Sequence, residues 1–210
     1  MYRSISFGEW NILAITDACI DFLALPRVRE CVLVGVKSAT YASKVVVVDF
    51  EESVKRIRDA ITTPKEKTTL YEEIPVNPWD EEEWRLYHAF RKNARCNIAA
   101  KLKECSVSPT KYRNWISRLD QFVLIQPAYY PGGLTNYCAV DIIFNSQYHQ
   151  QIADILGLLP STSLYFSFDK YLFARLFLLN RDEIDKVFTL INKMESYYSD
   201  YSATQVFPHW

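Results

Sequence analysis

The sequence predicts an α+β protein in which a winged-type helix-turn-helix unit lies between two ferredoxin-like (split βαβ) α/β sandwich domains. Three patterns predict this class. Residues 80–131 show helical periodicity interrupted by a short turn, residues 132–210 show the order β-α-β-β-α-β, and residues 1–79 repeat that order more faintly. We therefore expect three domains with these boundaries.

Composition predicts a folded chain without membrane contact. Of the 210 residues, 49 % are hydrophobic and 23 % are charged, which provides enough apolar surface for a core in each domain. No apolar run approaches the roughly 18–20 residues that a membrane span needs. The first residues also lack the apolar stretch of a signal peptide, so we expect a cytoplasmic protein.

The five cysteines and three histidines predict neither a metal site nor a cofactor. The chain has no C-x-x-C spacing, and no histidine lies at ligand spacing from a cysteine. Zinc needs four convergent ligands, so we expect the cysteines to be small buried hydrophobes. The sequence also lacks a G-x-S-x-G motif, a P-loop and a G-x-G-x-x-G motif, and we do not expect an enzyme.

In residues 1–79 the pattern predicts four strands and two helices. The strands are expected at 10–15, 31–36, 44–49 and 68–74, and the helices at 18–25 and 53–61.

An acidic run, Asp80 to Glu83, precedes the first helix of the central unit, which we expect over 84–90. Carboxylates in a first turn complement the helix dipole, so we interpret the run as a capped and solvated helix start. Leu86 and Phe90 are four residues apart and predict the buried face of this helix.

A short turn separates the next two helices. Asn97 is the expected N-cap of the second helix, with Ile98 and Leu102 on its buried face. Ser108 is the expected N-cap of the third helix. Pro109 then occupies the first helical position, where its missing N–H removes no hydrogen bond.

Apolar residues recur at i, i+3, i+4 and i+7 in the third helix and predict an inward stripe of Tyr112, Trp115, Ile116 and Leu119. The outward face then carries Lys111, Arg113, Asn114, Ser117 and Arg118. Residues 122–127 are expected to form a strand, a small wing, before a Pro-Gly-Gly boundary.

In residues 134–210 we expect strands at 136–144, 163–168, 172–179 and 204–207, and helices at 146–159 and after a cap at Asp182. The first helix would bury Tyr148, Ile152, Ile155, Leu156 and Leu159. The second would bury Ile184, Val187, Phe188, Ile191 and Met194.

Basic residues are concentrated in the central unit. Residues 91–118 hold eight of the 24 Lys and Arg residues and one acid, Glu104, whereas the whole chain has a net charge of −1. Residues 1–79 hold 10 basic and 11 acidic residues, and residues 127–210 hold 5 and 8. Such sorting of charge is typical of a surface that contacts phosphates.

A helix-turn-helix places its second helix in the major groove of DNA. We therefore expect Arg113 to contact guanine and Asn114 to contact adenine, with phosphate contacts on either side. The expected hydroxyl contacts to phosphate are Ser108, Thr110 and Ser117. The cationic contacts expected to supply the salt-dependent part of the affinity are Arg91, Lys92, Arg95, Lys101 and Lys103, and Lys111 and Arg118 of the outward face are also expected to contact DNA.

These residues resemble the DNA-binding half of the Lrp/AsnC (leucine-responsive/asparagine-type) transcriptional regulators. The likeness is carried by N-A-R at 93–95, V-S-P-T at 107–110, S-R-L at 117–119 and the apolar stretch 123–126. It extends more weakly over 80–210 and implies regulation of transcription, dimerisation through the sheet domain and room for a small-molecule effector. Two features depart from the family: 79 residues precede the helix-turn-helix, and the loop 168–171 lacks the usual glycines, so binding of an amino acid is not implied.

Two other functions fit the sequence. Sirohaem decarboxylases resemble this family and use the same frame for tetrapyrrole chemistry, although three scattered histidines argue against catalysis. Alternatively, the basic segment would bind RNA or an acidic protein in an interaction scaffold.

Overall fold

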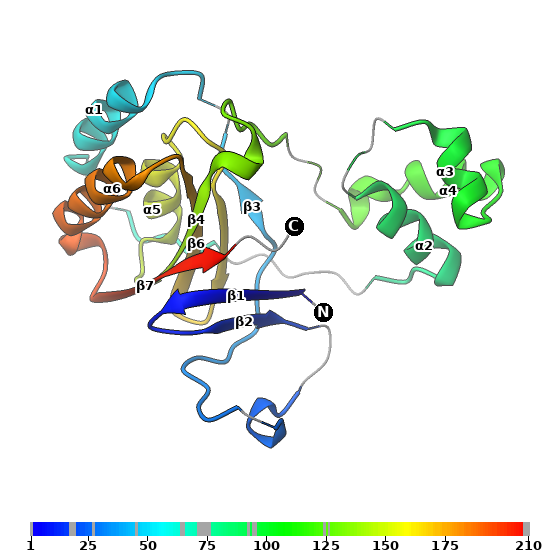
Figure 1. The fold of residues 1–210 in the computed structure, drawn as a ribbon, viewed down its shortest axis with the longest axis horizontal. Helices are drawn as coiled ribbons and strands as arrows, with labels where there is room; N and C mark the ends of the chain where they lie inside the picture. Colours follow the sequence, from blue (N-terminus) through cyan, green and yellow to red (C-terminus); the bar gives the residue numbers. More distant parts are fainter. Residues whose placement is uncertain are drawn as a thin grey trace. The chain divides into compact units, whose positions relative to one another are not determined.

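The computed structural model describes residues 2–16, 20–26, 28–44, 46–63, 66–70, 77–91, 93, 96–123, 125 and 127–207 (Figure 1). The chain divides into two compact units. The sheet unit comprises residues 1–73 and 127–210, and the helical unit comprises residues 74–126. The three predicted domains are therefore wrong in one respect, because residues 1–73 share a unit with the C-terminal segment.

The sheet unit contains a seven-stranded antiparallel sheet with the order β2-β1-β7-β4-β6-β5-β3. The C-terminal segment supplies strands β4 (Cys138–Asn145), β5 (Leu164–Phe168), β6 (Tyr171–Leu178) and β7 (Asp200–Phe207), and helices α5 (His149–Leu156) and α6 (Arg181–Lys193). The β-α-β-β-α-β order expected for this segment is present. Its α6 is capped by Asn180 rather than by Asp182, since the Asn180 side chain accepts a hydrogen bond from the Glu183 N–H at 2.9 Å.

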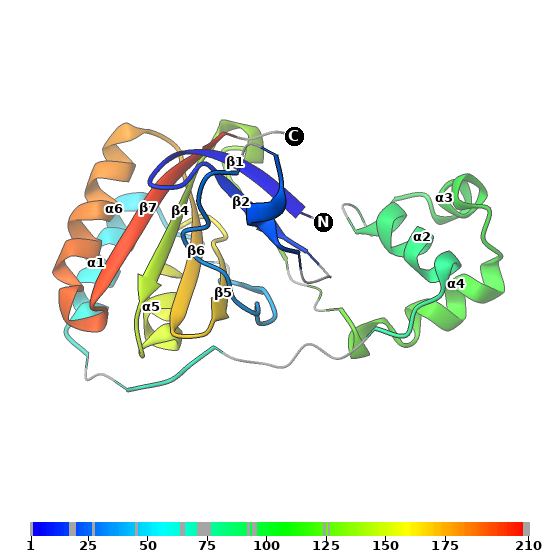
Figure 2. The ribbon, with the colours of Figure 1, turned by 90° about the horizontal axis from the view of Figure 1, so that it is seen from below.

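The N-terminal segment extends both edges of this sheet, as its strands at one edge in Figure 2 and the strand β3 in Figure 1 show. Strand β1 (Tyr2–Gly8) pairs with β7 on one side and with β2 (Ile12–Ile15) on the other. At the opposite edge the short strand β3 (Tyr41–Ala42) pairs with β5. Unpaired, β7 and β5 would expose rows of backbone donors and acceptors. This pairing explains why residues 1–79 do not form a ferredoxin-like domain of their own.

Helices α1 (Phe50–Ile61), α5 and α6 cover one face of the sheet (Figure 1). Val54 and Ile57 of α1 are buried in the same core as residues of α5 and α6. The Tyr197 hydroxyl donates a hydrogen bond to the Ile61 carbonyl at 3.0 Å, and Lys186 pairs with Glu51 at 2.6 Å. The N-terminal segment thus supplies one helix of a three-helix layer.

Several expected N-terminal elements differ in the structure. The strand at 10–15 and the helix at 53–61 are present as β2 and α1, whereas the segment 31–36 is not a strand, and neither are the described residues of 44–49. Val34 and Val36 are 71 % and 74 % exposed. A β-branched run forms a strand only where it finds a partner. The expected helix at 18–25 is a short 3₁₀ turn, η1 (Phe22–Ala24), with residues 17–19 outside the described part.

The expected strand at 68–74 consists, within the described residues, of one bridge between Thr68 and Tyr148, and residues 71–74 lie outside them. Strand β1 was not expected, although Ser4 to Phe7 alternate polar and apolar residues.

The second face of the sheet is also covered within the chain. Phe166, Phe168 and Phe173 are buried there, and Leu13 and Ile15 of β2 pack against them. The chain's own N-terminal segment therefore already occupies this aromatic surface. A dimer formed by packing two such sheets face to face would first have to displace it.

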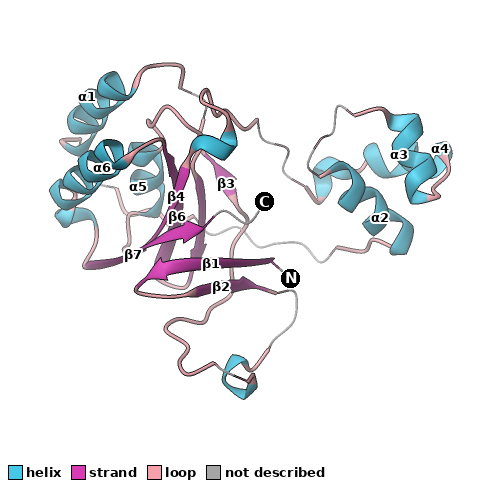
Figure 3. Cartoon of the chain, in the orientation of Figure 1, coloured by secondary structure: helices cyan, strands magenta, loops and turns pink. Residues whose placement is uncertain are grey.

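The helical unit contains α2 (Glu81–Phe90), α3 (Ile98–Cys105) and α4 (Pro109–Ile116) (Figure 3). A 3₁₀ turn, η2 (Leu119–Gln121), follows α4. The described residues of 122–127 form no strand, so the expected wing is absent from the part of the segment that the structure shows. Leu124 and Gln126 lie outside the described residues.

Candidate nucleic-acid interface

Helix α2 begins at a capping box formed by Asp80 and Glu83. The Asp80 carboxylate accepts from the Glu83 N–H at 2.9 Å, and Glu83 accepts from the Asp80 N–H at 3.2 Å. Leu86 and Phe90 are buried as predicted. The acidic run therefore fixes where this helix starts.

The turn between α3 and α4 is a Schellman motif. Asn97 caps α3 as predicted, and Ser106 ends it in the left-handed region at φ 55°. The Val107 N–H donates to the Leu102 carbonyl at 3.1 Å, and both side chains are buried together. Ile98 is 42 % exposed, so its predicted place on the buried face is wrong.

Helix α4 starts as predicted, with Ser108 as its N-cap and Pro109 in its first turn. Trp115 and Leu119 are buried, but Ile116, the last residue of α4, is 43 % exposed, so its predicted place on the inward stripe is wrong. Tyr112 is half-buried and packs against this core.

Trp79 is buried in the core of the helical unit, and the sequence did not predict its place there. Its ring lies 5.8 Å from the Trp115 ring and 5.2 Å from the Trp84 ring. Trp79 precedes the predicted boundary of the unit and belongs to no periodic pattern, so only its apolar character pointed to burial.

Four charged residues form an ion-pair cluster between α2 and the region of α4. Lys111 pairs with Asp80, and also with Glu83 at 3.6 Å, while Arg118 pairs with Glu83 at 2.6 Å. The Glu83 side chain is only 5 % exposed. The hydrogen bond from Lys111 holds the pKa of Asp80 below its usual value, and the same bond raises the pKa of Lys111. We call these four residues the ion-pair cluster.

The cluster changes what Lys111 and Arg118 can do. Both were expected to contact DNA, and the structure places both against carboxylates at the start of α2. The partners are 31 and 35 positions apart in the sequence, so no local spacing indicates the pairing. The sequence predicts a solvated helix start at 80–83, and its local pattern does not indicate that Asp80 and Glu83 hold α4.

Arg91, Lys103 and Arg113 are exposed, and none has an acidic partner among the described residues. Lys101 pairs with Glu104 at 2.8 Å, and this contact raises its pKa. Lys92 and Arg95 lie outside the described residues.

The polar residues of α4 lie on its solvent side. Thr110, Asn114 and Ser117 are exposed, and the Ser117 hydroxyl donates to the Asn114 carbonyl at 3.0 Å. The Ser108 hydroxyl accepts from the Lys111 N–H at 3.1 Å and therefore serves as a cap. Arg113 and Asn114 are thus neighbouring exposed side chains on the helix that follows the turn.

The described residues contain no group of three or more His, Cys, Asp or Glu side chains arranged to hold a metal ion. In the same part of the chain, no helix is both long and apolar enough to cross a membrane.

The sequence matches no family model and no curated protein. Among solved structures, Escherichia coli AsnC is similar to this chain, with a TM-score of 0.39 and 18 % identity. The comparison covers 63 % of this chain and 95 % of the AsnC chain. A likeness this weak does not carry the fold or the function of AsnC over to this protein.

Proposed function

We propose that the helical unit binds duplex DNA and that the protein regulates transcription. The proposal is supported chiefly by α4, which presents Arg113 and Asn114 to solvent from a helix that begins at a capped three-residue turn. An exposed helix of this kind suits the major groove, where side chains reach the edges of bases.

The contacts divide into two kinds. Arg113 would contact guanine and Asn114 adenine, each contributing roughly 1–3 kcal/mol of discrimination against the wrong base. Arg91 and Lys103 would contact phosphates, together with the hydroxyls of Thr110 and Ser117. Lys111 and Arg118 hold α4 on α2 in the free protein and contribute to phosphate binding only when they leave the ion-pair cluster.

The sheet unit would provide dimerisation, in the manner of a ferredoxin-like regulatory domain, and would place two helical units on two half-sites. Because the aromatic face of the sheet is already covered, such a dimer would use another surface of the unit. Multi-angle light scattering across protein concentrations measures this state directly, and a monomer at all concentrations contradicts the dimer.

The experiment that tests DNA binding compares Arg113→Ala with Arg58→Ala. Arg58 is an exposed arginine on α1 of the sheet unit and provides a control of equal charge. Fragments retained from a library of random duplexes would serve as targets, with fluorescence anisotropy as the measurement. We expect Arg113→Ala to lose about tenfold or more in affinity and to relax the sequence preference, while Arg58→Ala binds as the unchanged protein does.

Two results would redirect the assignment. Equal affinity of Arg113→Ala and the unchanged protein would mean that α4 does not read bases. Tighter binding of single-stranded RNA than of any duplex would favour an RNA-binding role for the same basic surface.

A further inference from the structure

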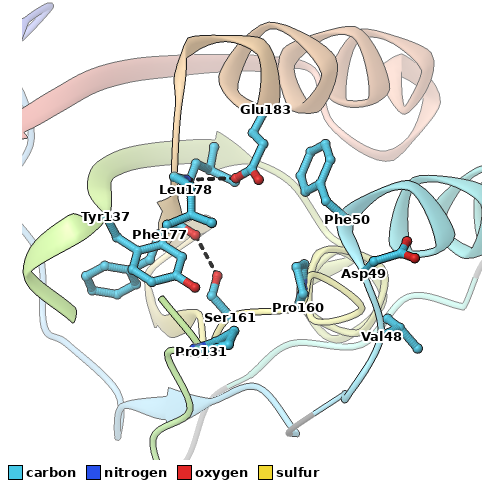
Figure 4. A pocket seen from close by; sticks show the side chains of 11 residues that line it. Val48, Asp49, Phe50, Pro131, Tyr137, Pro160, Ser161, Phe177, Leu178 and Glu183 are labelled. Atoms are coloured by element: carbon cyan, nitrogen blue, oxygen red, sulfur yellow. Dashed lines mark hydrogen bonds between the residues drawn. The ribbon is translucent and has the colours of Figure 1, made fainter. Parts of the chain in front are cut away.

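A pocket of about 270 Å³ lies in the sheet unit, where four connections of the chain meet (Figure 4). One wall comes from the residues that lead into α1, and a second from the turn before β4. The other two come from the α5–β5 connection and from the end of β6 with the start of α6. The apolar lining residues are Val48, Phe50, Pro131, Pro160, Phe177, Leu178 and Leu179. A mostly apolar hollow with a few polar groups is the usual form of a small-molecule site.

The polar groups of the pocket are Asp49, Tyr137, Ser161 and Glu183, and the Tyr137 hydroxyl accepts from the Gly132 N–H at 3.3 Å. The Ser161 hydroxyl is already used, because it donates to the Phe177 carbonyl at 2.5 Å. Asp49 is exposed at the rim and caps α1 by accepting from the Glu52 N–H at 2.8 Å. Glu183 is therefore the buried carboxylate of the pocket.

The Glu183 carboxylate is only partly satisfied within the chain. One oxygen accepts from the Leu179 N–H at 2.7 Å, and the described residues provide neither a second donor to the other oxygen nor a basic residue within ion-pair distance. Yet Glu183 is only 9 % exposed. Figure 4 shows its carboxylate directed toward the pocket, beside the ring of Phe50. A carboxylate buried this deeply is normally paired, and its place in the first turn of α6 stabilises the charge only in part.

Charge selects the ligand class. The pocket is lined by two carboxylates and by no lysine, arginine or histidine. A cation would supply the partner that Glu183 lacks, whereas an anion would meet two negative groups in a mostly apolar space.

We propose that this pocket binds a small apolar amine, whose ammonium group pairs with Glu183 while its apolar body contacts Phe50, Phe177 and Leu178. A free amino acid would fit less well, because its carboxylate would lie near Asp49 and Glu183. The N-terminal segment takes part in this site through the residues that lead into α1. The inference is independent of the DNA-binding proposal, because no residue of the helical unit lines the pocket.

The test uses the full chain and three probes of similar size: phenethylamine, 2-phenylethanol and phenylalanine. Isothermal titration calorimetry or saturation-transfer NMR would measure their affinities. We expect phenethylamine to bind with a Kd of the order of 0.1–1 mM. We expect it to bind about tenfold or more tightly than both the alcohol and the amino acid.

Glu183→Gln keeps an oxygen that can accept from Leu179 and removes only the charge, so it should abolish the preference for the amine over the alcohol. Asp182→Asn is the matched control, since Asp182 lies in the same helical turn, is exposed and does not line the pocket. Val48→Trp adds bulk to the wall that leads into α1 and should weaken the binding of all three probes. This variant tests whether the probes bind in this pocket if Glu183→Gln does not fold.

Equal binding of the amine and the alcohol by the unchanged protein would overturn the charge assignment. So would a preference for phenylalanine, or an amine preference that survives Glu183→Gln. Absence of binding by all three probes would overturn the site itself.

Discussion

Replacing Glu83 by Gln should move stability and DNA affinity in opposite directions. The Glu83 side chain is 5 % exposed, lies 2.6 Å from Arg118 and 3.6 Å from Lys111, and also caps the Asp80 N–H. Glutamine keeps the volume and the capping oxygen but loses the negative charge. The change therefore removes the ion pair of Arg118 and the longer of the two ion pairs of Lys111, which keeps its contact with Asp80, and it leaves most of the packing intact.

The expected loss of stability is modest. The Arg118 side chain is 50 % exposed and can turn into water when its partner is neutral, so no buried charge is left without a partner. A hydrogen bond to a charged group contributes roughly 1.5–3 kcal/mol, and exposure of one partner reduces this, so we expect a loss of about 1–2 kcal/mol. Urea denaturation followed by far-ultraviolet circular dichroism measures it.

The expected gain in DNA affinity follows from the released cation. Each additional phosphate contact steepens the salt dependence of log K by about 0.9, which corresponds to roughly tenfold in affinity at 0.1 M salt. Because Lys111 keeps its contact with Asp80, the release of Arg118 alone should steepen the slope by about 0.9. Fluorescence anisotropy between 50 and 200 mM salt gives both quantities.

Glu81→Gln is the matched control for this experiment. Glu81 is exposed in the same first turn of α2 and has no ion pair among the described residues. It removes the same charge without releasing a cation of α4, so its effect on the salt slope should be much smaller. If folded Glu83→Gln bound DNA no more tightly than Glu81→Gln, then Arg118 would not face the phosphates, and the proposed docking of α4 would be refuted.

Three further changes test the energetics of the fold. Arg175→Met should destabilise the sheet unit by about 3–5 kcal/mol, measured by urea denaturation, because it leaves the buried Asp141 carboxylate without its ion-pair partner. Arg175 lies 2.6 Å from Asp141, and this contact opposes the rise in the Asp141 pKa that burial causes. A much smaller loss would show that the buried carboxylate is satisfied elsewhere. Ser106→Gly should stabilise the helical unit by about 1 kcal/mol, because glycine adopts the backbone angle φ 55° of this position without strain. The measurement is the Tm, which should rise, and a fall in Tm would contradict this account of the turn. Burial lowers the pKa of His149, so as the pH falls this histidine is protonated in the unfolded chain before it is protonated in the folded protein. The free energy of unfolding should therefore fall below about pH 6.5, by at most about 1.4 kcal/mol per pH unit. His149→Gln should flatten this acid-side slope relative to the unchanged protein, and identical slopes would exclude His149 as the cause.

Local sequence patterns predicted the helical unit well. Asn97 and Ser108 were identified as caps, and Leu86, Phe90 and Trp115 as buried residues, because capping and helical periodicity act within a few positions. The exposed places of Ile98 and Ile116 were missed because they lie at a helix start and a helix end, where periodicity no longer fixes the facing direction.

The candidate site could be predicted in composition but not in its pairing. The acidic residues just before residue 91 offset part of the positive charge of 91–118. From Asp80 to Arg118 the chain holds nine basic and five acidic residues, which reduces the local net charge to +4. Which of these basic residues pairs with a carboxylate depends on how α2 and α4 pack. The pocket beside Glu183 was not foreseen either, because its walls come from four separate parts of the chain.

The sequence by itself determined the elements whose causes are local: the three helices of residues 81–116, their caps, and the β-α-β-β-α-β order of the C-terminal segment. The tertiary structure alone decided that Ile5 pairs with Phe207 and that Val54 shares a core with Ile191. The physical reason is that strand pairing and core packing depend on which exposed edge or apolar face a segment finds. Residues 1–79 carry strands and a helix that fit a domain of their own, but the unpaired edges of β5 and β7 offered those strands backbone partners and joined them to a single sheet.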